Sequence, residues 1–295
     1  MEGLLALLTN SFISGALSPL FVRLGTQEFP LSVFTFLRFF IAVLVFFPIV
    51  LRFKKKFNWE KFPSLVFYSL FFSGNAIFFG LGLQYTSVLA SQILYAAVPI
   101  FTGIFSYLII HEKFSRYKIM GALISLSGVL FIIYQSAGAS SVFSLGTPFG
   151  NIIILMGVVC WSLYLVFSKK ITAVFTPIET SFTSYVVTLL ISLFIIPFEY
   201  YLKPFDISQV TSVGVTSLIG VGVVSTAFSF YLIQYGVKKT SPFTASLFFY
   251  MGPFFSSLTA VPLLHEKLTF QLIIGGFLIL LGVFFATSYE FIKRK

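Results

Sequence analysis

Residues 99–128 read PIFTGIFSYLIIHEKFSRYKIMGALISLSG, and residues 253–282 read PFFSSLTAVPLLHEKLTFQLIIGGFLILLG. The two stretches share a leading proline, a His-Glu-Lys triplet and two glycines, at a constant offset of 154 residues. A Gln-Tyr pair precedes each stretch, at residues 84–85 and 234–235. An internal repeat within a strongly apolar chain is typical of transporters. The repeat therefore indicates the fold and the class of protein more strongly than any single residue does.

The composition excludes a water-soluble domain. Of the 295 residues, 58% are hydrophobic and only 9% are charged, whereas soluble domains carry about 25% charged residues. Long unbroken apolar runs indicate membrane-spanning helices, because the strands of a membrane barrel alternate in polarity. We therefore expect an all-α integral membrane protein embedded in the lipid bilayer. The N-terminal run contains Glu2 and lacks a basic n-region, so we interpret it as a retained helix rather than a signal peptide.

The apolar runs predict ten transmembrane helices, since each needs about 20 apolar residues. The predicted spans are residues 3–22, 31–51, 63–82, 87–110, 117–135, 149–168, 178–201, 210–233, 242–264 and 269–290. The Ser/Gly-rich stretch 135–148 is the longest connection and the natural linker. We therefore predict two five-helix repeats, at residues 1–138 and 139–295. Because five is an odd number, the second repeat enters the membrane inverted relative to the first.

The basic residues in the short loops predict the orientation of the chain in the membrane. With the N-terminus inside, 15 of the 19 Lys and Arg residues fall on the inner side. Only Arg23, Lys203 and Lys267 then fall in outer loops. We therefore predict that both termini are cytoplasmic. This bias also accounts for the net charge of +10, and without a long soluble domain no nucleic-acid partner is expected.

The ten-span arrangement resembles the EamA-type members of the drug/metabolite transporter superfamily, over nearly the whole chain. Residues 38–42 (RFFIA) resemble the Arg-Phe-x-x-Ala pattern of that family's second span. The glutamates that end the fourth and ninth spans (Glu112 and Glu266) and the prolines within them (Pro99 and Pro253) are also similar to the family's pattern. The resemblance implies secondary transport of small organic metabolites, often export of amino acids, across a bacterial inner membrane. It implies neither a particular substrate nor a direction.

The two prolines predict a discontinuity in the fourth and ninth spans. Proline lacks the backbone N–H and clashes with the preceding helical turn, so Pro99 and Pro253 should kink these helices and free a carbonyl group. In lipid such a group is tolerated beside a neighbouring helix or a water-filled cavity. We therefore expect both prolines to serve as kink or gating positions beside a cavity between the repeats.

The candidate substrate-binding residues are polar or aromatic and lie at mid-depth in the predicted spans. They are Gln92, Tyr95, Ser246, Tyr250, Asn75, Ser225, Trp161 and Tyr164. Helical spacing places Gln92, Tyr95 and Pro99 on one face of the fourth span. Asn10, Ser14 and Ser18 recur every four residues in the first span and form a further candidate face. Ordinary helix packing with polar contacts is the alternative interpretation of all these residues.

Two ionisable side chains within or near the spans have two interpretations each. Arg38 lies inside the second span, where a charge is a functional hypothesis by default. It would either bind a substrate carboxylate or brace the bundle by bonding backbone carbonyls, and the resemblance favours the structural role. Glu179 is the best carboxylate for a proton step, but a solvated residue at the start of the seventh helix, stabilised by the helix dipole, is favoured.

The two His-Glu-Lys triplets do not predict a metal site. The predicted topology puts His111 and His265 on opposite sides of a bilayer about 30 Å thick, so they cannot share a metal ion. Glu112 and Glu266 are interpreted as helix-end residues that pair with nearby basic residues or cap a backbone turn. No cofactor is expected.

Secondary transport by alternating access, with a small-molecule substrate, is therefore the leading hypothesis. Export of amino acids or related compounds is favoured, with uptake or exchange of S-adenosylmethionine or a nucleoside as the alternative. The sequence has no P-loop for ATP hydrolysis and no nucleophile–base pair at one depth, so an enzyme is not expected. A structural membrane protein and a homo-oligomeric assembly are both left open.

Overall fold

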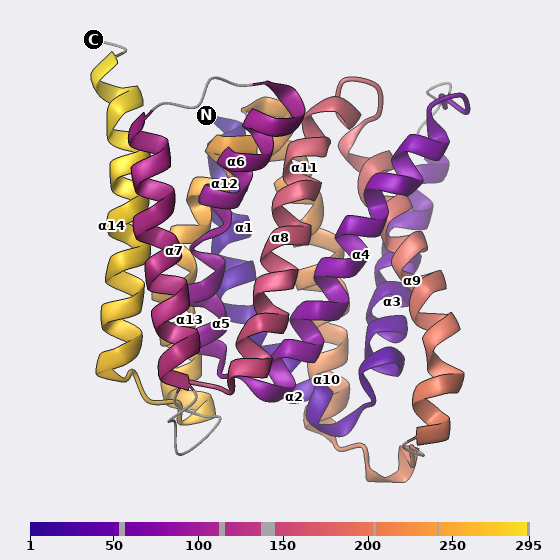
Figure 1. The fold of residues 1–295 in the computed structure, drawn as a ribbon. Coiled ribbons are helices and arrows are strands. Elements are labelled where there is room, and N and C mark those ends of the chain that lie inside the picture. The colour runs from indigo at the N-terminus through magenta and orange to yellow at the C-terminus, as the bar shows by residue number, and fades with distance from the viewer. Residues whose placement is uncertain (53–56, 112–115, 137–144, 203–204, 241, 294–295) are drawn as a thin grey trace.

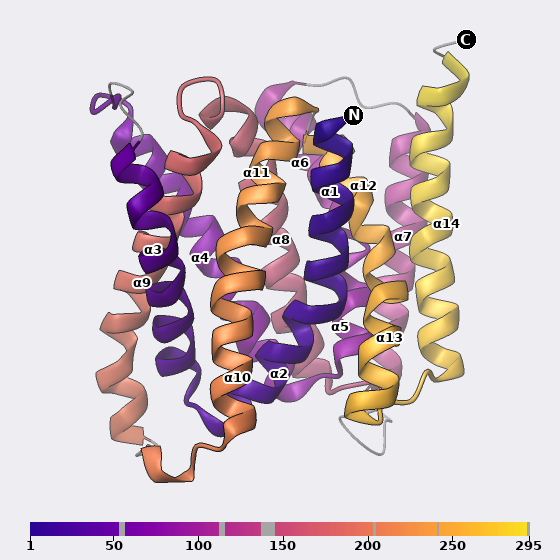
Figure 2. The same ribbon diagram turned by 180° about the vertical axis from the view of Figure 1, so that it is seen from behind.

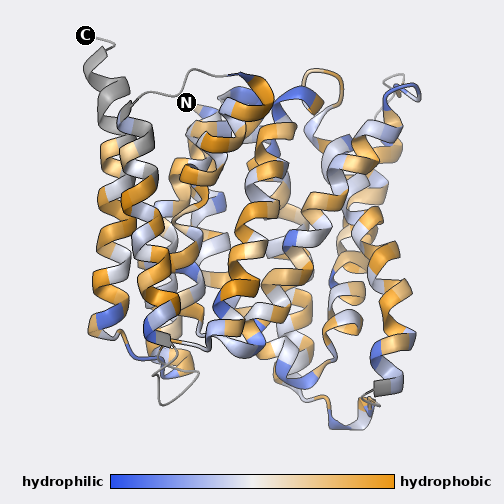
Figure 3. Ribbon diagram, in the orientation of Figure 1, coloured by the Kyte–Doolittle hydropathy of each residue, from blue (hydrophilic) through white to orange (hydrophobic). Residues whose placement is uncertain are grey.

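The computed structural model describes residues 1–52, 57–111, 116–136, 145–202, 205–240 and 242–293. Within these residues the chain forms helices and turns and no strands. The helices run side by side in one bundle, and both termini lie at the same end of it (Figures 1 and 2). Hydrophobic residues dominate the middle of the helices, and hydrophilic ones gather toward the two ends (Figure 3). This distribution is the one expected of a bundle that crosses a bilayer.

The first set of five spans starts with α1 at the end of the bundle where the termini lie, and successive spans alternate in direction (Figure 1). In chain order they are α1 (Glu2–Phe12), the π-helix η1 (Ile13–Leu17) and α2 (Ser18–Glu28) as one span, α3 (Leu31–Arg52), α4 (Phe62–Tyr85), α5 and α6 (Val88–Tyr95 and Val98–Ile110) as one span, and α7 (Arg116–Ser136).

The second set of five spans starts with α8 at the opposite end of the bundle, so this set is inverted relative to the first (Figure 1). They are α8 (Pro148–Ile171), α9 (Pro177–Leu202), α10 (Ser212–Gly220) with the π-helix η3 (Val221–Phe228) and α11 (Ser229–Lys239), α12 (Pro242–Leu247) with the 3₁₀ turn η4 (Phe248–Met251) and α13 (Gly252–Leu264), and α14 (Phe270–Lys293). A short 3₁₀ turn, η2 (Ile207–Gln209), precedes α10.

The ten-helix prediction is confirmed for the part of the chain that the structure describes. Eight spans there are long and apolar enough to cross a membrane. The apolar stretches Leu123–Gln135 and Phe270–Gly282, within α7 and α14, are shorter. The protein is therefore an all-α, multi-pass integral membrane protein.

The fourth and ninth spans are broken at mid-depth. Helix α5 ends at Tyr95 and α6 begins at Val98, with Pro99 in its first turn. In the ninth span the 3₁₀ turn η4 separates α12 from α13, which carries Pro253 in its first turn. Proline is favoured there because its missing N–H would have no helical partner. The predicted kinks thus coincide with short interruptions of the α-helical hydrogen-bond pattern, while a gating role for the prolines stays a prediction.

Each broken span ends at the histidine of a His-Glu-Lys triplet. His111 and His265 adopt the left-handed conformation, with φ of 54° and 53°. Their backbone N–H groups donate to Ser106 O and Ala260 O, which closes the last turn of the helix. The two histidines are therefore matched C-terminal caps, a role that the sequence pattern did not reveal. Glu112 lies outside the described residues.

Every span of the first five packs against a span of the last five. The pairs are α1–α2 with α10–α11, α3 with α9, α4 with α8, α5 with α13, and α7 with α14. The α7–α14 pair approaches most closely at glycines, and Ser125 Oγ of α7 donates to Ile279 O of α14 at 2.8 Å. Small residues allow two backbones to meet in a membrane, where no hydrophobic effect drives helices together. The bundle interior is thus enclosed by helices from both ends of the chain.

The first span is longer than predicted. It was expected to end at residue 22, with Arg23 in an outer loop, but the helix continues to Glu28 and Arg23 is buried. The loop position of Arg23 is therefore a wrong prediction. Its guanidinium donates to Leu83 O, and to Thr86 O at 3.4 Å, near the C-terminal end of α4. A buried cation is stabilised there because the last carbonyls of a helix carry partial negative charge.

Candidate functional site

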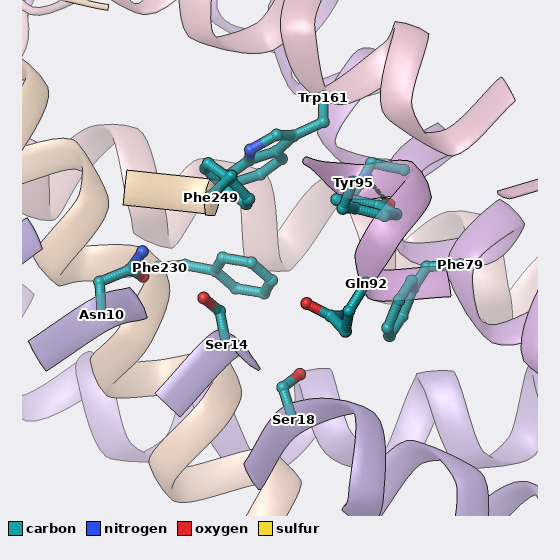
Figure 4. A pocket seen from close by; sticks show the side chains of 10 residues that line it. Asn10, Ser14, Ser18, Phe79, Gln92, Tyr95, Trp161, Phe230 and Phe249 are labelled. Atoms are coloured by element: carbon teal, nitrogen blue, oxygen red, sulfur yellow. Dashed lines mark hydrogen bonds between the residues drawn. The ribbon is translucent and has the colours of Figure 1, made fainter. Parts of the chain in front are cut away.

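A pocket lies inside the bundle, between the first five spans and the last five (Figure 4). It holds about 460 Å³ of space unfilled by protein atoms, part of it continuous with solvent. Ten residues line it: Asn10, Ser14, Ser18, Asn75, Phe79, Gln92, Tyr95, Trp161, Phe230 and Phe249. The broken spans contribute to this lining through α5 and η4. The helix breaks therefore lie beside the pocket.

Five aromatic rings form one continuous wall of the pocket. Phe79 meets Tyr95 at 5.4 Å between ring centroids, and Tyr95 meets Phe249 at 6.4 Å. Trp161 lies 5.9 Å from Phe249 and 5.8 Å from Phe230. The indole N–H of Trp161 is buried and has no hydrogen-bond partner in the described part of the protein. This wall thus offers flat apolar surface and one unused donor.

The facing wall is polar and uncharged. Figure 4 shows the side-chain oxygens of Ser14, Ser18 and Gln92 facing the same space. Asn10 accepts a hydrogen bond from Ser229 Oγ at 2.8 Å, which fixes its amide group. Gln92 Oε1 lies so close to Gly252 that a Cβ atom there would stand only 2.8 Å away. The pocket therefore has an apolar side and a hydrogen-bonding side.

Asn75 joins three helices at the edge of the pocket. Its amide nitrogen donates to the Tyr95 hydroxyl and, at 3.0 Å, to the carbonyl of Gly157 in α8. A Cβ at Gly157 would lie 3.0 Å from the Tyr95 hydroxyl, so glycine provides the space for this contact. Asn75 thus fixes the position of Tyr95 as well as lining the pocket.

The structure brings four of the eight predicted binding residues together and places the other four outside the lining. Ser246 is buried and donates to Phe243 O at 2.7 Å, and the buried Tyr164 hydroxyl bonds Ser184 Oγ at 3.0 Å. The hydroxyls of Ser225 and Tyr250 are buried without a described partner. A substrate-binding role for all eight residues stays a prediction.

Tyr250 does not line the pocket. The 154-residue offset pairs it with Ala96, which does not line the pocket either. Phe249, at the 154-residue offset from Tyr95, faces the pocket instead. The repeat offset was the signal that could have found it. Phe79 and Phe230 were not predicted either, and no pattern distinguished them among 41 phenylalanines.

Arg38 is buried but does not line the pocket. Its guanidinium carbon lies 4.7 Å from the centroid of the Phe39 ring. Its Nε has no hydrogen-bond partner among the described residues. The structural and substrate roles of Arg38 both stay predictions.

Glu179 caps its own helix. Its carboxylate accepts from Thr176 N at 2.6 Å and from Thr176 Oγ1 at 2.8 Å, and its own N–H donates back to Thr176 Oγ1 at 3.3 Å. This reciprocal arrangement is a capping box. Among the described residues no cluster of His, Cys, Asp and Glu has the grouping of a metal site.

Comparison with known proteins shows the class. The model of the EamA-like transporter family matches residues 1–134 and 148–288. The uncharacterized transporter YoaV of Bacillus subtilis (strain 168) is 26% identical over 277 residues, covering 93% of this chain and 92% of the relative. An uncharacterized transporter of Archaeoglobus fulgidus is 28% identical over 254 residues, and the match covers 84% of this chain and 85% of the relative.

One solved crystal structure has the same fold. The TM-score is 0.66 with 21% sequence identity, and the match covers 98% of this chain and 96% of that one. At this level of identity the likeness concerns the fold alone. Its extent along both chains means that all ten spans take part in the match.

Proposed function

This chain belongs to the EamA-like transporter family, and from that premise we propose that it is a secondary transporter (permease) for small organic metabolites. The substrate binds in the pocket lined by Gln92, Tyr95, Trp161 and Phe249 and crosses by alternating access. Amino acids and related compounds are the proposed substrates, and export is the proposed direction. Under this proposal the protein lies in a bacterial inner membrane with both termini cytoplasmic.

The pocket's position and lining carry this proposal. It lies between the two family-matched segments, residues 1–134 and 148–288, which is where inverted repeats place a substrate site. All ten lining residues belong to these two segments, so the lining is shared between them.

The chemistry of the two walls supports a neutral or zwitterionic substrate with a flat apolar part. No acidic or basic side chain occurs among the ten lining residues. Ring faces favour planar groups, while amides and hydroxyls bond amino and carboxyl groups. A nucleoside or S-adenosylmethionine shares these features, because each has a planar base and several hydrogen-bonding groups. Ring faces would also attract the sulfonium of S-adenosylmethionine. Uptake or exchange of such a compound is the alternative that the experiment separates.

The helix breaks support alternating access. The turns Ala96–Ala97 and Phe248–Met251 interrupt two facing spans beside the pocket. A broken helix bends at lower cost than a continuous one, because backbone hydrogen bonds are already interrupted there. Movement at these turns would expose the pocket to one side of the membrane and then the other.

Transport into proteoliposomes tests the proposal. Purified protein is reconstituted, and flux of radiolabelled amino acids, nucleosides and S-adenosylmethionine is measured with and without a pH gradient. Saturable flux of one class should fall at least about tenfold in Gln92→Ala and Trp161→Ala. Gln27→Ala, at an exposed position near the end of α2, is the matched control and should keep full flux. Saturable flux that both pocket variants retain would place the pathway elsewhere.

A further inference from the structure

Glu266 binds the start of a helix from the other half of the protein. Its carboxylate oxygens accept from Val88 N at 2.7 Å and Leu89 N at 2.9 Å, the first two residues of α5. Val88 and Leu89 belong to the family-matched segment 1–134, and Glu266 belongs to the segment 148–288. The two segments are therefore tied together through one buried carboxylate, whose residue is only 3% exposed.

Two more glutamates make the same kind of bond between the segments. Glu199 of α9 accepts from Leu31 N at 3.0 Å and Ser32 N at 2.7 Å, at the start of α3. Glu28 of α2 accepts from the backbone N of Thr211 at 2.8 Å and from its Oγ1 at 2.7 Å, at the start of α10. The partners are 167 to 183 residues apart in sequence. We call Glu28, Glu199 and Glu266 the glutamate clamps.

All three clamps lie at the end of the bundle opposite the termini. The end of α2, the start of α10 and the end of α13 gather there, away from the N- and C-termini (Figure 1). The first amides of a helix lack helical acceptors and carry partial positive charge, so a carboxylate is a strong partner for them. A helix start is usually capped by a residue close to it in sequence, as Glu179 caps α9. Caps supplied by the other segment hold the two segments together at one end.

The Glu266 clamp lies just beyond the pocket. Gln92 follows Val88 by four residues and Arg23 follows Ser18 by five, which is about 6 to 8 Å along a helix at 1.5 Å per residue. Arg23 and Glu266 also attract each other electrostatically. This ionic group therefore lies one to two turns from the pocket, on the side away from the termini.

We propose that the glutamate clamps form a gate, closed in this structure, which must separate for substrate to pass between the pocket and the side opposite the termini. This inference rests on the proposed function. Opening at that end separates helix ends that come from different segments, and such movement pulls the carboxylates of Glu28, Glu199 and Glu266 from the helix starts that they cap.

The Glu266 bond is suited to repeated opening. Burial raises the pKa of the Glu266 carboxyl, while the amides of Leu89 and Val88 and the charge of Arg23 act in the opposite direction. The carboxylate is thus held against a dehydration cost, which it recovers when the gate opens and water reaches it. Because the dehydration cost offsets part of the hydrogen-bond energy, the gate closes but can open again.

Thiol labelling of the pocket measures opening without requiring transport. Ser18→Cys supplies the reporter, in a Cys160→Ser background that removes the chain's single native cysteine. A membrane-impermeant maleimide is applied from the side opposite the termini, in vesicles of known orientation. Glu266→Gln keeps the side-chain shape but removes the charge, and its NH₂ group faces a backbone N–H that now lacks an acceptor. We expect the labelling rate to rise about tenfold, with smaller increases for Glu28→Gln and Glu199→Gln.

Glu179→Gln is the matched control. It also removes the charge of a helix-capping carboxylate, but one whose partner, Thr176, belongs to its own helix. Its labelling rate should equal that of the reporter parent. Equal rates in Glu266→Gln and Glu179→Gln would overturn the gate.

A second variant opens the gate without touching a glutamate. A Cβ at Gly214 would collide with the Glu28 carboxylate, so Gly214→Ala should displace Glu28 from Thr211 and also accelerate labelling. Flux assays on the same proteins separate the two proposals. Faster labelling in a protein without flux keeps the gate and rejects the transport function. Normal flux with unchanged labelling in every clamp variant and in Gly214→Ala keeps the transport function and rejects the gate.

Discussion

Replacing Gly128 by alanine tests how closely α7 and α14 must approach. A Cβ added at Gly128 would lie 2.7 Å from Gly275 O and 2.9 Å from Leu278 Cβ on the facing helix. Ordinary contacts of this kind begin near 3.4 Å, so the two backbones would have to separate by several tenths of an ångström. That movement also stretches the bond from Ser125 Oγ to Ile279 O.

The expected loss of stability follows from two opposing terms. Overpacking of a well-packed interior costs about 1–3 kcal/mol, whereas alanine is favoured over glycine in a helix by about 1 kcal/mol. Gly276→Ala supplies the control, because a Cβ there meets only Ile93, at 3.5 Å. Gly276→Ala gains the helix preference of alanine over glycine without the steric clash. The difference between the two variants therefore isolates the steric term, at about 1–3 kcal/mol.

Reversible unfolding in mixed detergent micelles, followed by circular dichroism, measures both variants against the parent. Gly128→Ala should unfold at lower denaturing-detergent content than the parent, and Gly276→Ala at equal or higher content. If Gly128→Ala is as stable as Gly276→Ala, the close approach of α7 and α14 contributes nothing, and the reasoning from backbone contact is refuted.

Three further predictions concern single side chains. Trp161→Phe keeps a ring in the pocket wall but removes the indole N–H, which has no described partner. The half-saturating substrate concentration in proteoliposome flux should therefore rise about 2- to 12-fold. An unchanged value would show that this group does not contact substrate. His265 has φ of 53°, in the left-handed region that favours glycine. In thermal unfolding His265→Gly should be at least as stable as the parent, and His265→Val should be less stable by about 1–2 kcal/mol. Equal stability of the two variants would contradict the left-handed cap. Tyr250→Phe removes a buried hydroxyl that has no described partner. Flux should be unchanged, and the free energy of unfolding should be equal to the parent's or higher by about 1 kcal/mol. A loss of flux would indicate that Tyr250 binds substrate.

The fold was predictable because a bilayer restricts the choices. Apolar runs long enough to span, separated by short polar loops, leave little freedom beyond helix ends. The ends were the weak point. Arg23 marked a loop by charge alone, yet the helix continues because the guanidinium finds carbonyl partners, Leu83 O and Thr86 O, on another span. Such a contact between distant residues leaves no trace in local composition.

The candidate site was predictable where helical periodicity holds. Gln92 and Tyr95 precede the break in their span and both line the pocket, as the spacing of a continuous helix predicts. In the ninth span Phe249, the repeat mate of Tyr95, takes the pocket position, while Tyr250 corresponds to Ala96, which does not line the pocket. The aromatic wall could not be predicted, because a phenylalanine that faces a pocket and one that faces lipid look alike in sequence.

The glutamate clamps also impose an order on biosynthesis. Glu266 is synthesised 178 residues after Val88, an interval of about 9 to 36 s at a translation rate of roughly 5–20 residues per second. Throughout that interval the first amides of the fourth span have no carboxylate to bind. Water or lipid phosphate at the membrane surface must serve in its place. Assembly therefore includes a late exchange of partners at the start of α5, and a chain truncated before Glu266 would remain at the stage before that exchange.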